Sequence, residues 1–209
     1  LHMPNIPQYV FGLAAISKLG ATGSGVSPLL APPELAHQIG DAKIKVLMSY
    51  DALAPAVVAM GDAAPSCLET ILFCGARYSL DAPELSVPDI AGRTVKHYGP
   101  ITTEASDRFT RVKIDPTDTF MIQYTGGTTG KPKGAELSHR TLLHNPIQVT
   151  ALSTPTQLGD EVYVSAFPYF HIAGLCFLLM GIISGGSSEC LPDPRDTDRI
   201  CAAMAARPP

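Results

Sequence analysis

The sequence has 209 residues, of which 45% are hydrophobic and 16% are charged, a balance that excludes a disordered polymer. Fifteen basic and nineteen acidic residues give a formal net charge of −4, and no basic cluster offsets it, so nucleic acid is not an expected partner. The length suits one sizeable domain or part of a larger one.

The first third of the chain alternates between helical and strand-like patterns. Helices separating strands in this way are typical of βαβ units, so we predict an α/β fold with mostly parallel sheets and flanking helices. In chain order, the pattern predicts a helix over 8–19 ended by Gly20, a short strand over 25–27, a helix over 33–39, a strand over 44–49, a helix over 51–60 with Asp51 as its cap, and a strand over 69–74.

The region from 75 to 118 is rich in Pro and polar residues, and we expect a long irregular connection with one or two short strands. Residues 172–183 carry no charge. Twelve helical residues span about 18 Å, which is short of a ~30 Å hydrocarbon core, so this segment predicts a buried helix and not a transmembrane segment. The remaining predictions are a strand over 119–124, a helix from 139 capped by Ser138 and kinked or split by Pro146, strands over 162–167 and 188–191, and a last helix from 196.

Both ends of the sequence look like cuts through a longer protein. The chain starts at Leu1 without an initiator Met, and its last residues, 205–209, show no capping element. Its five cysteines form no CxxC pair and no zinc-type spacing with His, which indicates reduced thiols in a cytoplasmic compartment. No signal peptide is seen, and a peripheral association with a membrane or an organelle stays open.

The segment that carries chemistry is 124–134, which reads YTGGTTGKPKG. Glycines let the backbone approach a ligand and turn its N–H groups towards an anion. Threonine hydroxyls add donors or a magnesium ligand, and two lysines add positive charge. The segment therefore predicts a clamp for nucleotide phosphates, and an ordinary Gly/Thr hairpin is the competing interpretation.

Two other nucleotide-binding patterns do not fit the sequence. In a GxxxxGK[ST] loop, a glycine would stand five residues before Gly130, where this chain has Thr125, and a hydroxyl residue would follow Lys131, where it has Pro132. The GxGxxG fingerprint fails as well, because Val, Ser and Pro follow the glycines at 23 and 25.

The segment resembles the phosphate-binding signature of the adenylate-forming superfamily, which usually reads Tyr/Phe-Thr-Ser-Gly-Thr-Thr-Gly-x-Pro-Lys-Gly. Gly126 replaces the usual Ser, and Glu136 stands where an apolar residue is common. Residues 167–174, FPYFHIAG, resemble the Pro-x-Phe-His-x-x-Gly motif of the same superfamily. The stretches 126–127, 138–140 and 194–196 are similar to bacterial long-chain fatty-acid ligases. The resemblance implies that residues 1–209 are part of the AMP-binding amino-terminal domain, with the carboxy-terminal domain absent.

The resemblance also implies roles for single residues. His171 would line the junction of the acyl and nucleotide pockets, and a core histidine at a helix start is the alternative. Thr125 would also touch Mg²⁺. The residues that would wrap the β- and γ-phosphates of ATP or add charge against them are Thr125, Gly126, Gly127, Thr128, Thr129, Gly130, Lys131 and Lys133.

The implied reaction joins a carboxylic acid to coenzyme A at the expense of ATP. The carboxylate attacks the α-phosphate, which gives an acyl-adenylate and pyrophosphate, and the thiol of coenzyme A then takes the acyl group. The sequence lacks the Gly-Tyr-Gly-x-Thr-Glu and Thr-Gly-Asp motifs of the superfamily and its catalytic lysine, so we expect the isolated chain to be inactive. Three interpretations stay open: a fatty-acyl-CoA ligase, another branch such as an aryl-CoA ligase or adenylation domain, and a non-catalytic truncated nucleotide-binding protein. The patterns specify neither the acyl chain length nor the oligomeric state.

Overall fold

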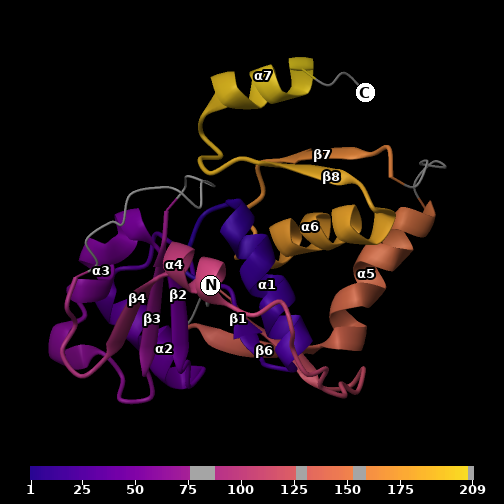
Figure 1. Ribbon diagram of the computed structural model, residues 1–209. Helices are drawn as coiled ribbons and strands as arrows, with labels where there is room; N and C mark the ends of the chain where they lie inside the picture. Colours follow the sequence, from indigo (N-terminus) through magenta and orange to yellow (C-terminus); the bar gives the residue numbers. More distant parts are fainter. Residues whose placement is uncertain (76–87, 126–130, 153–158, 207–209) are drawn as a thin grey trace.

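The computed structural model describes residues 1–75, 88–125, 131–152 and 159–206 (Figure 1). Short 3-10 turns occur at Asp51–Leu53 and Gly61–Ala63. The helices are α1 (Pro7–Leu19), α2 (Pro32–Asp41), α3 (Ala54–Val58), α4 (Tyr98–Glu104), α5 (His139–Leu152), α6 (Ile172–Ser184) and α7 (Thr197–Ala206). The strands are β1 (Gly23–Ser24), β2 (Val46–Tyr50), β3 (Thr70–Cys74), β4 (Thr94–His97), β5 (Thr119–Thr125), β6 (Lys133–Ser138), β7 (Val162–Ser165) and β8 (Ser187–Cys190).

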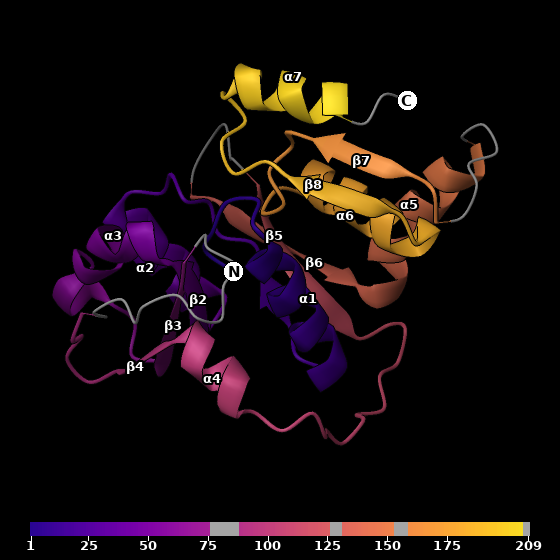
Figure 2. The ribbon, with the colours of Figure 1, turned by 45° about the horizontal axis from the view of Figure 1, so that its top comes forward.

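The described strands form three small sheets with helices beside them. Their orders are β2-β3-β4, β1-β5-β6 and β7-β8. Helix α1 lies at the centre, with the β2-β3-β4 sheet on one side and α5 and α6 on the other (Figure 1, Figure 2). All strand pairs are parallel except β5 with β6, so the predicted α/β fold with mostly parallel sheets and flanking helices is confirmed.

The β2-β3-β4 sheet packs against α2 through a compact apolar cluster. On α2, Leu35 and Ile39 are four residues apart and therefore lie on the same face of the helix. Both are fully buried, as are Leu47 on β2 and Ile71 on β3. Glu34 accepts a hydrogen bond from the backbone N–H of Ala31 at 2.9 Å, which satisfies one donor at the start of α2.

The β1-β5-β6 sheet connects the first part of the chain to α5. Phe120 on β5 stacks on the ring of His139, with centroids 4.4 Å apart. Ser138 accepts a hydrogen bond from the N–H of Thr141 at 3.1 Å, so the predicted cap at the start of α5 is confirmed. At the start of the chain, α1 has Pro at its first turn and ends at Gly20, whose φ of 63° is the left-handed conformation that favours glycine.

The β7-β8 pair packs on α6, and α7 follows as the last described helix (Figure 2). Helix α6 ends at Gly185, whose φ is 69°. One side of α6 is buried, including Leu175 and Leu178, whereas Phe177 and Ile182 are exposed. No helix in the described part of the chain is long and apolar enough to cross a bilayer. The segment at 172–183 is a helix, as predicted, but only one of its faces is buried.

Several predicted elements differ from the structure. The strand predicted over 25–27 lies two residues earlier, at Gly23–Ser24. The helix predicted over 51–60 is shorter, because Asp51–Leu53 forms a 3-10 turn and the α-helix covers only Ala54–Val58. The prediction that Asp51 caps it is wrong, since the residue before α3 is Leu53 and no described side chain caps the helix. Helix α4 and strand β6 were not predicted. Pro146 does not split α5, since its side chain is buried and packing supplies most of the stability of helices in proteins.

Candidate functional site

The glycine-rich segment connects β5 to β6, which pair as an antiparallel hairpin. The last pair of the hairpin joins Thr125 on β5 to Lys133 on β6. Both residues are exposed, as is Lys131 just before β6. Gly126, Gly127, Thr128, Thr129 and Gly130, which the sequence assigns to the clamp, lie outside the described residues. Paired flanking strands fit both the clamp and the competing ordinary hairpin, so both interpretations stay predictions. The described ends bring a hydroxyl and lysines to the same end of the hairpin.

The residue before Thr125 is tied to a distant helix. Tyr124 donates a hydrogen bond from its phenol oxygen to Oδ2 of Asp41, the last residue of α2, at 2.5 Å. Burial and this hydrogen bond raise the pKa of Tyr124, because both disfavour the phenolate. Sequence reasoning missed Asp41, since 83 residues separate it from Tyr124.

His171 caps the amino terminus of α6. Its Nδ1 accepts a hydrogen bond from the N–H of Ala173 at 3.3 Å, and its backbone is extended at φ −101°. The side chain is exposed, so the alternative of a core histidine is wrong. The exposed ring is consistent with a ligand-facing role, and that role stays a prediction.

The loop before His171 is held by the side chain of Asn5. The amide nitrogen of Asn5 donates to the carbonyl of Phe167 at 2.9 Å, and its oxygen accepts from the N–H of Tyr169 at 2.7 Å. Tyr9 on α1 donates its phenol hydrogen to the carbonyl of Tyr169 at 2.9 Å. Asn5 and Tyr9 are both buried. Asn5, near the start of the chain, thus fixes a loop more than 160 positions away.

Two glycines let the backbone of this loop approach closely. A Cβ on Gly174 would lie 2.0 Å from the carbonyl oxygen of Pro168, and a Cβ on Gly25 would lie 2.5 Å from that of Phe170. Atoms cannot approach that closely, so only glycine fits at either position. The glycine that ends the Pro-x-Phe-His-x-x-Gly pattern is therefore required by packing against the loop, which it helps to place before His171.

An apolar cavity lies elsewhere in the described residues. Its volume is about 740 Å³, and it is enclosed by α1, the β1-β5-β6 sheet and the connection from α2 to β2. Neither Thr125, Lys131, Lys133 nor His171 lines it. Its lining is mainly apolar, including Ile16, Ile44, Met48, Leu72 and Ile122. The predicted phosphate site is thus an exposed hairpin end in the described residues and does not coincide with this cavity.

The donor groups present fit an anion better than a metal ion. Two ammonium groups and one hydroxyl at the hairpin end are the groups that bind polyphosphates. In the described part of the chain, no group of three His, Cys, Asp or Glu residues is placed to hold a metal. Thr125 supplies one oxygen where Mg²⁺ prefers octahedral coordination, so the described residues at the hairpin end do not form a magnesium site by themselves.

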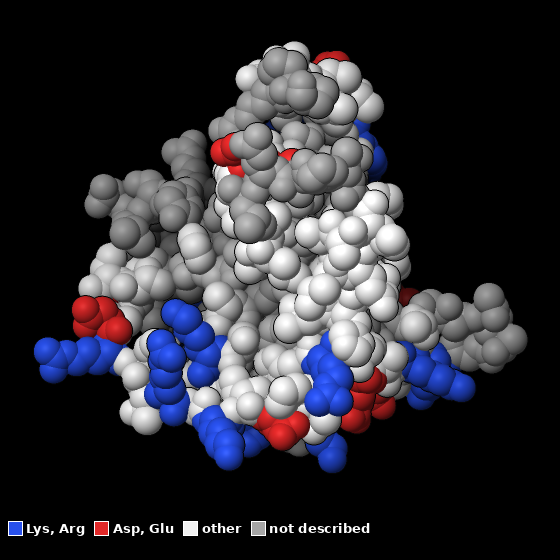
Figure 3. Space-filling model, turned by 90° about the vertical axis from the view of Figure 1, so that its right-hand side faces the viewer, with Lys and Arg blue, Asp and Glu red and all other residues white. Residues whose placement is uncertain are grey.

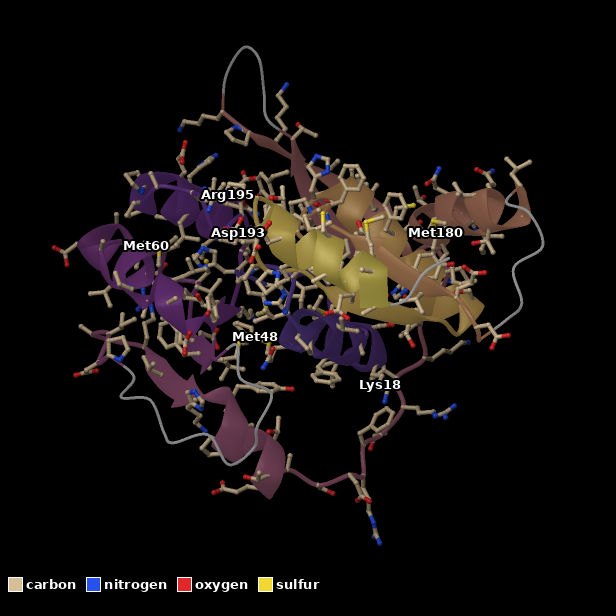
Figure 4. All side chains as sticks on the ribbon, turned by 90° about the horizontal axis from the view of Figure 1, so that it is seen from above. Lys18, Met48, Met60, Met180, Asp193 and Arg195 are labelled. Atoms are coloured by element: carbon tan, nitrogen blue, oxygen red, sulfur yellow. The ribbon has the colours of Figure 1, made fainter. Side chains whose placement is uncertain are left out.

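Charged groups are sparse on the face made by α5 and α6. In the view of Figure 3, Lys and Arg side chains gather along the lower edge, with some acidic ones among them, and the middle of the face is mostly uncharged. At the opposite end of the molecule, Arg195 pairs with Asp193 at 3.0 Å in the turn before α7 (Figure 4). Both side chains are largely exposed, so this pair contributes little to stability.

Comparison with known proteins agrees with the fold and the sequence motifs. A family model described as AMP-binding enzyme matches residues 1–208. A long-chain-fatty-acid–CoA ligase of Escherichia coli O6:H1 is 31% identical over all of this chain, which spans 39% of the length of that ligase. The 4-coumarate–CoA ligase 1 of Arabidopsis thaliana is 28% identical over 92% of this chain and 33% of its own length.

A solved structure shares the same fold. The crystal structure of an anthranilate CoA ligase in complex with anthranoyl-AMP superposes with a TM-score of 0.83 at 20% identity, over 100% of this chain and 38% of that one. The superposition places the chain among α/β proteins with this fold. With the family model matched over nearly all its residues, the chain belongs to the AMP-binding enzyme family.

Proposed function

We propose that the natural protein containing this chain is an ATP-dependent fatty-acyl-CoA ligase, and that residues 1–209 form part of its AMP-binding domain. The observation that carries the proposal is the exposed end of the β5–β6 hairpin, where Thr125 lies opposite Lys133 and a glycine-rich sequence joins the strands. The relative at 31% identity is named a long-chain-fatty-acid–CoA ligase, which supports the fatty-acid branch. The domain assignment is supported by the family match, and the chain spans well under half of that relative.

The proposed role of the hairpin end is to neutralise and orient the triphosphate of ATP. Ammonium groups of Lys131 and Lys133 supply positive charge, and the hydroxyl of Thr125 donates a hydrogen bond to a phosphate oxygen. The backbone N–H groups of the glycine-rich segment are proposed to complete the cradle. Mg²⁺, when bound with ATP, adds further neutralisation of the phosphate charge.

The reaction that such a site serves has two steps. A carboxylate oxygen of the acid attacks the α-phosphorus of ATP, and the bond from that phosphorus to pyrophosphate breaks. The thiol of coenzyme A, after losing its proton, then attacks the acyl carbon and AMP leaves. Holding the triphosphate in line with the acid accelerates the first step mainly through positioning and charge stabilisation.

His171 at the start of α6 is proposed to face the substrate carboxylate. The 209 residues alone are proposed to bind nucleotide without completing the reaction.

The test is carboxylate-dependent exchange of labelled pyrophosphate into ATP by the natural polypeptide. Hexadecanoate and 4-coumarate are compared as acids, because the Arabidopsis relative favours the aryl branch as the second candidate. Faster exchange with hexadecanoate supports the fatty-acyl ligase, and faster exchange with 4-coumarate would move the protein to the aryl branch. Absence of exchange with every carboxylic acid would contradict the proposed function.

A further inference from the structure

We propose that Tyr124, Asp41 and Gly134 form an anchor that positions the ATP-binding end of the β5–β6 hairpin. This inference rests on the function proposed above, because it gives these three residues a role in ATP binding. None of the three is among the residues assigned to phosphate contact. They are positioning residues, acting through Thr125 and Lys133.

The first observation is the hydrogen bond between strand and helix. The phenol oxygen of Tyr124 donates to Oδ2 of Asp41 at 2.5 Å. Hydrogen bonds to a charged carboxylate are shorter and stronger than those between neutral groups. Asp41 ends α2, which packs on the β2-β3-β4 sheet, whereas Tyr124 lies in the β1-β5-β6 sheet. The bond therefore ties the hairpin to a different layer of the molecule.

A second contact from α2 reaches the same strand. Gln38 lies three residues before Asp41, so both side chains project from one side of the helix. The buried amide of Gln38 donates to Oγ of Ser24 at 3.1 Å and to the carbonyl of Gly25 at 2.9 Å. Ser24 in turn donates to the carbonyl of Ile122 on β5 at 2.9 Å. Helix α2 thus holds β5 at Ile122 through β1 and at Tyr124 directly.

The third observation explains the last glycine of the YTGGTTGKPKG segment. Gly134 is the register partner of Tyr124 on β6. A Cβ on Gly134 would lie 2.7 Å from Cγ2 of Ile122 and 3.1 Å from Cζ of Tyr124. Its φ is not in the left-handed region, so backbone freedom does not require glycine here. Glycine instead leaves room for the Ile122 side chain and for the Tyr124 ring that reaches Asp41.

The anchor is one residue from the proposed phosphate contacts on both strands. Tyr124 precedes Thr125 on β5, and Gly134 follows Lys133 on β6. Because Thr125 and Lys133 are themselves exposed, the neighbouring anchor limits how far this end of the hairpin can move. Loss of the anchor should weaken ATP binding while the binding of the carboxylic acid is unchanged.

The experiment measures KM separately for ATP and for the acid, by pyrophosphate exchange with the natural polypeptide. The variants are Tyr124→Phe, Asp41→Ala and the double variant, because Phe lacks the donor and Ala lacks the acceptor of this hydrogen bond. Thr119→Val is the matched control, because it removes a hydroxyl that donates to Glu136 at 3.3 Å at the other end of the same hairpin. Asp41 is exposed, so Asp41→Ala answers the question even where Tyr124→Phe fails to fold.

The expected result is a rise of about five-fold in KM for ATP in each single variant, the factor that one lost hydrogen bond corresponds to. The double variant should be no worse than either single one, because both remove the same bond. KM for the acid should stay within about two-fold, and Thr119→Val should behave as the unchanged protein in both constants.

Three outcomes would overturn the inference. An unchanged KM for ATP in Asp41→Ala shows that the bond does not position the site. If KM for ATP and KM for the acid rise equally in the anchor variants, and rise likewise in Thr119→Val, the bond only stabilises the fold. If the unchanged protein performs the exchange and the anchor variants have the same KM for ATP, the proposed function stands and the anchor is refuted. If the unchanged protein performs no exchange, both fall.

Discussion

Replacement of Asn5 by alanine tests whether the loop before His171 is held as the structure indicates. The Asn5 amide makes two hydrogen bonds to the backbone of this loop, one as donor to Phe167 and one as acceptor from Tyr169. Asn5→Ala removes both partners at once. The N–H of Tyr169 then lies buried without a partner, and the carbonyl of Phe167 loses its donor.

The expected cost follows from those two groups. A buried polar group that loses its partner costs about 1–3 kcal/mol. The Tyr169 bond is buried and should lie in the upper part of this range, whereas the Phe167 bond is only partly buried and should lie near the bottom. Together they predict a loss of about 2–4 kcal/mol in the free energy of unfolding, a large share of the ~5–15 kcal/mol typical of a domain.

Urea unfolding followed by circular dichroism measures this loss. Thr22→Val is the matched control, because Thr22 also joins distant segments through one side-chain hydrogen bond, to the carbonyl of Thr119 at 3.0 Å, but at an exposed position. We expect the control to lose less than about 1 kcal/mol. A loss below about 1 kcal/mol in Asn5→Ala, or one equal to that of the control, would refute the reasoning.

Three further predictions concern single residues. Gly174→Ala should destabilise the fold by about 3 kcal/mol or more, because its Cβ would overlap the backbone of Pro168, and a loss below about 1 kcal/mol in thermal unfolding would contradict this. Burial lowers the pKa of the His2 imidazole from 6.5 to about 4, so the unfolded state binds a proton at a higher pH than the folded state does. The free energy of unfolding should therefore fall by up to about 3 kcal/mol as the pH drops from about 6.5 to about 4. His2→Gln should flatten that part of the stability profile, and an unchanged slope would exclude His2 as its source. Burial also raises the pKa of the Cys74 thiol to about 12, so iodoacetamide followed by mass spectrometry should modify exposed Cys201 well before Cys74, and equal rates would contradict this.

Local patterns predicted the elements whose periodicity comes from burial on one face. Helix α2 is an example, since Leu35 and Ile39 at helical spacing both face the β2-β3-β4 sheet. The strand at Thr119–Thr125 was equally readable, and so was the glycine that ends α1. In each case the residues that define the element are close together in the sequence.

Strand β6 could not be read in the same way. Four of its six residues are exposed, so it shows no alternation of apolar and polar side chains, and its existence depends on hydrogen bonds to β5. The interruption near Asp51 and the continuity of α5 through Pro146 also depend on packing with distant segments. Propensity rules describe only the local preference and are overridden there.

The same difference separates the residues of the candidate site that the sequence identified from those that it did not. The glycine-rich segment and His171 were found because their motifs are contiguous. Asp41 and Asn5 were not assigned roles, because their contacts with Tyr124 and with the loop before His171 span 83 and more than 160 positions. A single sequence contains no signal that pairs such residues.

The most direct test of the central claim is calorimetric titration of the chain with MgATP and with inorganic triphosphate. We expect both ligands to bind. Replacing Lys131 and Lys133 together by alanine should weaken the binding of both by about ten-fold or more, since each charged hydrogen bond contributes about 1.5–3 kcal/mol. In the matched control, Lys18 on α1 and Lys96 on β4 are replaced by alanine. This removes the same amount of charge from elements other than the hairpin. No binding of either ligand, or equal weakening by both pairs of substitutions, would contradict the account.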